Sequence, residues 1–163
     1  MVKDTIKYFI YICLIFSVML MGSAPDIAEA AISKNVFDRA VADTKQELMY
    51  SGRYPMIVDI DISLREHPTD VVMALVVKSA TDRVTALNLG EELIRCFSRN
   101  AVKNGSGTTM PTKDNYGSLF DEYGIYLAIA PKHATTDPSQ WYYNYVISPR
   151  AHMAQGPGNP RWR

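Results

Sequence analysis

The sequence has little cysteine and little histidine, and it carries no net charge. Its 163 residues include two cysteines, three histidines, and 17 basic and 17 acidic residues. A balanced charge creates no broad electrostatic field, so neither nucleic acid nor an anionic membrane surface is an expected partner. The scattered histidines show no pair at metal-ligand spacing, so no metal site is expected. The chain also lacks a glycine-rich phosphate loop and a dinucleotide fingerprint, and we expect no cofactor.

The N-terminal thirty residues show the three regions of a secretory signal peptide. Lys3 and Lys7 precede an apolar run over residues 8–21, and a small-residue ending follows at 28–30. This pattern predicts cleavage after Ala30 and a secreted or periplasmic protein. An uncleaved membrane anchor is the alternative, although the run is shorter than the roughly 20 residues of a membrane span.

Cleavage at that point would leave a chain of ordinary domain size. We expect residues 31–150 to form a single domain, followed by a flexible basic tail over residues 151–163. Removing two basic and three acidic residues from the 17 of each leaves 15 basic and 14 acidic residues. Cys13 leaves with the apolar run, so Cys96 has no disulfide partner in the chain. Its large apolar neighbours at helical spacing favour burial over nucleophilic catalysis.

Apolar periodicity predicts the element order helix, two strands, helix, two strands. Ser33 is the expected N-cap of the first helix, and Thr81-Asp82 is expected to supply the N-cap of the second. Short links between paired strands favour an antiparallel sheet of about four strands with both helices on one face, an α+β two-layer domain. The expected helices cover residues 33–51 and 82–101, and the expected strands cover residues 56–65, 71–77, 123–130 and 141–148.

Strand alternation assigns side chains to the two faces of this sheet. In the first strand, Val58 and Ile60 are expected to share the packed face. In the last strand, Trp141 and Tyr143 are expected on one face and Tyr142 on the other. Aromatic residues thus fall on both faces of the last strand, which a small domain cannot easily bury.

An open sheet face makes the binding prediction specific. We expect Tyr126 and Tyr142 to lie beside Asp59 and Asp61 on the face away from the helices, as an exposed aromatic and acidic patch. Simple cross-strand pairing of tyrosines on a solvated face is the alternative. Trp162, between two arginines in the tail, is a further candidate anchor.

These patterns favour a non-enzymatic exported protein of the bacterial envelope that binds another envelope protein or a polymer. The sequence pattern assigns no catalytic residue to this favoured function. The alternative function is a small extracytoplasmic hydrolase that uses Asp59 and Asp61, which alternate strand positions place about 7 Å apart. Calcium is not expected there, because it takes six or more oxygen ligands. After cleavage, no stable membrane span is expected.

Overall fold

The computed structural model describes residues 32–65 and 70–149. The predicted signal peptide and the predicted tail at 151–163 lie outside these residues. Within them, the predicted α+β order of helices and strands is confirmed, with short additional turns. The elements are α2 (Lys34–Lys45), η1 (Gln46–Tyr50), β1 (Ile57–Arg65), β2 (Asp70–Val77), α3 (Arg83–Lys103), α4 (Leu119–Glu122), β3 (Gly124–Pro131), η2 (Lys132–Ala134), η3 (Pro138–Gln140) and β4 (Tyr143–Ile147).

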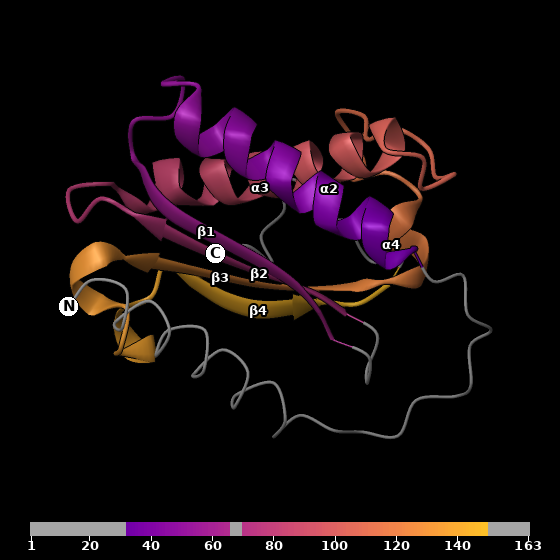
Figure 1. Cartoon of the computed structure of the whole chain (residues 1–163). Helices are drawn as coiled ribbons and strands as arrows, with labels where there is room; N and C mark the ends of the chain where they lie inside the picture. Colours follow the sequence, from indigo (N-terminus) through magenta and orange to yellow (C-terminus); the bar gives the residue numbers. More distant parts are fainter. Residues whose placement is uncertain (1–31, 66–69, 150–163) are drawn as a thin grey trace.

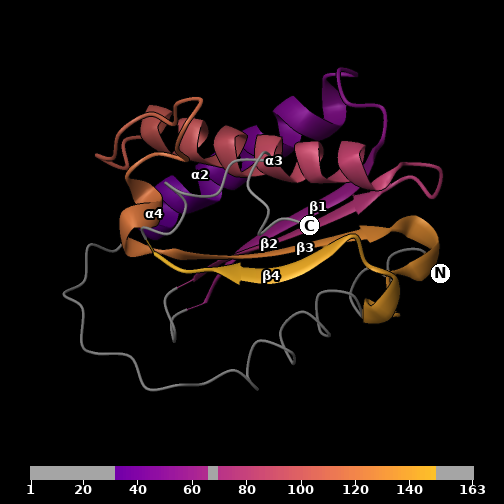
Figure 2. The same cartoon turned by 180° about the vertical axis from the view of Figure 1, so that it is seen from behind.

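Two layers form the fold. Helices α2 and α3 lie side by side over one face of the sheet, as both views show (Figures 1 and 2). The main hydrophobic core fills the space between these layers and includes Phe37 of α2, Phe97 of α3 and Leu75 of β2. The rings of Phe37 and Phe97 meet edge to face at 5.4 Å between centroids. The predicted two-layer arrangement, with helices on one face, is therefore confirmed.

The sheet is mixed, which corrects the expectation of an antiparallel sheet. Its order is β1-β2-β3-β4, and the outer pairs β1–β2 and β3–β4 are antiparallel. The central pair β2–β3 is parallel, with Asp70 opposite Gly124 and Val77 opposite Pro131. The long helix α3 connects these two strands and returns the chain to the end of the sheet where β2 began. A crossover of this kind makes the joined strands parallel.

Both predicted helix caps are present. The Ser33 hydroxyl accepts a hydrogen bond from the Val36 amide at 3.4 Å at the start of α2. The Asp82 carboxylate accepts from the Thr85 amide at 2.9 Å at the start of α3. Each cap satisfies a backbone donor that the first helical turn leaves without a partner.

A β-bulge changes the facing of the first strand. Ile57 pairs with Val77 and Asp59 pairs with Val76, so Val58 is the additional residue. Past the bulge, Ile60 faces the helices as predicted and is buried. Val58 instead packs against the cluster on the opposite face, so its predicted sharing of a face with Ile60 is wrong. Bulges are invisible to a period-2 pattern because they insert one residue into it.

Gly90 allows α3 to approach the sheet closely. A Cβ atom at this position would lie 2.5 Å from Ile129 Cδ1 and 3.3 Å from Leu127 Cδ2. Both partners belong to β3. The glycine in the middle of a 21-residue helix is thus explained by packing.

Candidate binding face

The sheet face opposite α2 and α3 carries an apolar cluster of its own. No helix or strand among residues 32–65 and 70–149 stacks over its centre (Figure 2). Its central members are small alanine and valine residues from β2 and β3, and they are buried. We call this surface the open face. The cluster consists of Val72, Ala74, Val76, Tyr126, Ala128, Ala130 and Trp141, with Val58 and Val146 packed against it.

The two tyrosines predicted to share the open face lie on opposite faces of the sheet in the structure. Tyr126 lies on the open face as predicted, but it is only 2 % exposed, and its hydroxyl lies 2.5 Å from Asn144 Oδ1. Tyr142 packs against the main core instead, and its hydroxyl donates to the Thr81 carbonyl at 2.5 Å. Trp162 lies outside the described residues. The expected exposed patch of Tyr126 and Tyr142 is therefore not formed.

The facing of Trp141 and Tyr142 is opposite to the sequence-based expectation. Strand β4 begins only at Tyr143, so the alternation does not extend back to Trp141. Trp141 joins the open-face cluster, and its indole nitrogen donates to the Ala134 carbonyl at 3.0 Å. The turn η3 directly before it sets this orientation.

Asp59 and Asp61 lie on the open face at the β1 edge, as predicted, and both are half-buried. Asp59 Oδ1 accepts a hydrogen bond from the Ile60 amide at 2.8 Å. Asp61 Oδ1 lies 3.9 Å from Lys45 Nζ at the end of α2. No group of three His, Cys, Asp or Glu side chains that could hold a metal ion occurs in the described part of the chain.

The pKa of Asp61 is raised above its ordinary value of 3.8. Burial is the largest cause, Lys45 opposes it, and the charge of Asp59 adds to it. Folded Asp61 therefore holds its proton at pH values where the unfolded chain has lost it. The free energy of unfolding must then fall as the pH rises through this range.

We expect Asp61→Asn to flatten this pH dependence. The substitution removes the titrating group and keeps the size of the side chain. Urea unfolding at several pH values from about 4 upward measures the slope. The matched change Ser63→Ala, two residues along the same strand face, should leave the slope as in the wild type. An unchanged slope in Asp61→Asn would show that Asp61 does not titrate in this way.

A buried ion pair marks the end of the open face. Arg65 Nη2 donates to Asp70 Oδ2 across the β1–β2 pair, with side chains 14 % and 5 % exposed. The Nε and Nη1 atoms of Arg65 are buried and have no hydrogen-bond partner. Gly124 lies beneath the Asp70 carboxylate, and a Cβ atom there would collide with it. Two donors of the guanidinium are thus buried without an acceptor at this end of the sheet.

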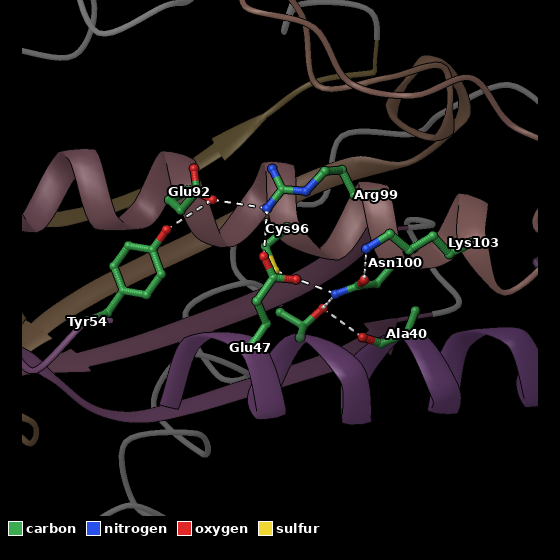
Figure 3. A network of polar contacts seen from close by, with 9 residues as sticks. Ala40, Glu47, Tyr54, Glu92, Cys96, Arg99, Asn100 and Lys103 are labelled. Carbon is green, nitrogen blue, oxygen red and sulfur yellow. Dashed lines mark hydrogen bonds and ion pairs between the residues drawn. The ribbon is translucent and has the colours of Figure 1, made fainter. Parts of the chain in front are cut away.

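On the opposite side of the sheet, a polar network between the helices was not predicted (Figure 3). Arg99 Nη2 lies 3.1 Å from Glu47 Oε1 and 3.0 Å from Glu92 Oε1. The Tyr54 hydroxyl lies 3.4 Å from Glu92 Oε1. Glu47 belongs to the π-helical turn η1, which directly follows α2. Arg99 therefore links the end of the first helical segment to α3.

Cys96 lies at the buried end of this network. Its side chain is fully buried, and Asn100 Nδ2 lies 3.5 Å from its sulfur. Asn100 Nδ2 also donates to the Thr44 hydroxyl at 3.2 Å. Burial, with the nearby Glu47 charge, raises the pKa of the Cys96 thiol to about 12. The predicted burial is confirmed, and this environment does not activate a nucleophile.

We expect the Cys96 thiol to react with a maleimide or disulfide reagent only after unfolding. At neutral pH, labelling of the folded protein should be more than about a hundredfold slower than labelling in urea, because both thiolate content and access are low. Mass spectrometry of quenched samples measures the two rates. Similar rates would mean that the α2–α3 contact opens readily.

Arg95 forms hydrogen bonds with the loop that follows α3. Its guanidinium donates to the carbonyls of Thr112, Lys113 and Asn115. The same guanidinium carbon lies 4.8 Å from the centre of the buried Tyr116 ring. These bonds tie residues 112–115, at the end of the loop after α3, to the helix.

Within the described residues, no helix is long and apolar enough to span a membrane.

Comparisons with known proteins identify no relative. No protein-family model matches the chain, and neither a curated protein nor a solved structure matches it.

Proposed function

We propose that this protein is a non-enzymatic, exported binding module of the bacterial envelope, and that its partner docks against the open face. The observation that carries the proposal is the apolar cluster on the sheet face away from α2 and α3, which no described helix covers. The members of the cluster are at most 8 % exposed, so the face presents an apolar interior against which a further layer can pack. The N-terminal signal pattern of the sequence supports the proposed location.

The charge of Arg65 indicates which chemical group a partner would present at this end of the open face. Two of its donor atoms are buried without an acceptor, which costs free energy as long as they stay unpaired. The Arg65 side chain is 14 % exposed, so a partner carboxylate can approach the guanidinium from outside, and pairing with Nε or Nη1 requires the side chain to turn outward. We therefore propose a partner that presents an apolar surface with an acidic group at one end. Trp162 of the tail is proposed as a second contact.

The test is cross-linking capture from the native envelope with three matched proteins. Val58→Lys places a charge on the open face at a half-buried edge position. Val84→Lys makes the same change at an exposed position in the first turn of α3. The proposal expects one set of partners to be captured by wild type and Val84→Lys and lost with Val58→Lys. Equal capture by all three proteins, or by none, would contradict it.

Two further variants test the chemistry of the face. Arg65→Lys keeps the charge but loses the forked donor geometry, and it should weaken capture. The double change Asp59→Asn with Asp61→Asn addresses the alternative function as a hydrolase. A hydrolytic activity that this double change abolishes would favour the alternative, whereas partner capture that survives it favours the binding module.

A further inference from the structure

Helix α3 ends in a cap that depends on glycine. Asn104 follows the last helical residue, and Gly105 after it has a backbone φ of 93°. The Gly105 amide donates to the Val102 carbonyl and the Ser106 amide donates to the Ala101 carbonyl, both at 3.0 Å. These are the two bonds of a Schellman motif, which places a left-handed residue directly after the helix. The fold therefore favours glycine at the position after Asn104.

The side chain of Asn104 links this helix end to α2. Its Nδ2 atom donates to Asp43 Oδ2 at 2.8 Å and to the Asn100 carbonyl at 2.9 Å. Asp43 is an exposed residue near the end of α2. One turn earlier in α3, Asn100 makes a second polar contact between the same helices, with Thr44. The bond between Asn104 and Asp43 is thus the polar contact of this row that lies nearest the end of α3.

The order of these two residues also has a chemical consequence. Asn104 is the one asparagine of the sequence that glycine follows. Such an asparagine can lose its side-chain nitrogen without an enzyme, because glycine has no side chain to shield its own amide nitrogen. Gly105 is exposed, and nothing lies within 4 Å of the place where its Cβ atom would be. The reacting atoms are therefore accessible to water.

The reaction has two steps. The Gly105 nitrogen attacks Asn104 Cγ, a new C–N bond closes a succinimide ring, and the side-chain nitrogen leaves as ammonia with the amide proton. A water molecule then adds to one of the ring carbonyls and breaks its bond to the ring nitrogen. The product is an aspartyl or an isoaspartyl residue at position 104.

We propose that Asn104 is a site of spontaneous deamidation, and that its bond to Asp43 controls the rate. The attack requires the Gly105 amide to leave its carbonyl partner and the Asn104 side chain to turn away from Asp43. Both bonds lie at a helix end, where local opening costs less free energy than opening of the core. The folded protein therefore reacts, but more slowly than the unfolded chain. This proposal does not depend on the proposed function, because α2 and α3 lie on the other side of the sheet from the open face (Figure 2).

Deamidation replaces a hydrogen-bond donor with a negative charge. The new carboxylate faces the carboxylate of Asp43, so a bond between α2 and α3 becomes a contact of like charges. An isoaspartyl linkage also adds a methylene group to the backbone, which the Schellman motif cannot accommodate. The end of the α2–α3 contact should loosen as a result. Cys96 lies buried at this contact, so its reactivity reports the change.

The first experiment measures the reaction itself. Protein is incubated at mildly alkaline pH, and peptide mass spectrometry follows deamidation at each asparagine. Asn104 should react in the folded wild type, more slowly than in urea, and about threefold faster in Asp43→Ala, which lacks one exposed hydrogen bond. The matched change Asp38→Ala removes an exposed acid of the same helix that pairs with Lys34, and it should react like the wild type. Asn104→Gln should not react, because its longer side chain disfavours ring closure.

The second experiment measures the consequence of the new charge. Asn104→Asp carries the charge of the product, and its Cys96 thiol should react with a maleimide about threefold faster than in the wild type. Asn88→Asp makes the same change at an exposed position of α3 and should leave this rate unchanged.

Three results would overturn the proposal. The first is a folded wild type that shows no deamidation at Asn104 over a time in which the unfolded chain has reacted. The second is an Asp43→Ala variant that reacts at the wild-type rate, because Asp43 would then not control the reaction. The third is equal labelling of Cys96 in Asn104→Asp and the wild type, because the product would then leave the α2–α3 contact intact.

Discussion

Replacing Gly90 with valine is expected to lower the free energy of unfolding by about 2 kcal/mol, the typical cost of overpacking a core. The first added carbon would lie 2.5 Å from Ile129 Cδ1 and 3.3 Å from Leu127 Cδ2. The two further methyl groups of valine must enter the same space between α3 and β3. Ile129 can turn away from one carbon, but the packed sheet has no room for three. Urea unfolding followed by circular dichroism measures the change.

Asn88→Val provides the matched control for Gly90→Val. Asn88 is exposed on the same helix two residues earlier, so it receives the same side chain without entering the core. Its effect should stay within about 0.5 kcal/mol, as for most surface substitutions. If the two variants were equally stable, α3 would not lie against β3 as closely as the structure places it.

Removing Asp70 is expected to cost about 3 kcal/mol, because it leaves the mostly buried Arg65 guanidinium without its carboxylate. A guanidinium cannot lose its proton to escape this cost.

Arg65→Met should lower the free energy of unfolding less than the removal of Asp70 does when the pH is acidic. Burial already raises the pKa of Asp70 while Arg65 lowers it, so the remaining acid can be protonated. Its cost should therefore grow as the pH rises.

The double variant completes a thermodynamic cycle for this pair. Arg65→Met combined with Asp70→Ala removes both charges, so its loss should be smaller than the sum of the two single losses by about 2 kcal/mol. Urea unfolding of the four proteins at acidic and at slightly alkaline pH provides the data. Strictly additive losses would show that the pair contributes no coupling to the sheet end.

The local elements could be predicted because each has a signal within its own residues. Ser33 and Asp82 sit at helix starts, and β2 is apolar at every position after Asp70, as a strand buried on both faces requires. The presence of Asp59 and Asp61 on the open face follows from alternation alone. Tyr126 also lies on the predicted face.

The remaining features depend on contacts between distant residues. The direction of β3 relative to β2 is set by the crossover through α3, which periodicity does not describe. The network of Glu47, Glu92 and Arg99 joins residues up to 52 positions apart. One local signal was available: Thr44 is a polar residue at a core position of α2, and its hydroxyl donates to the Ala40 carbonyl and accepts from Asn100.

The parallel β2–β3 pair also affects the order in which the chain can fold. The pairs β1–β2 and β3–β4 join consecutive strands and can form early as local hairpins. The central pair must wait for residues 78–123, which separate its strands. During synthesis, which proceeds from the N-terminus, the apolar strand β2 therefore keeps one unpaired edge until residue 131 has left the ribosome. During this interval the nascent protein is most exposed to aggregation and most in need of a chaperone.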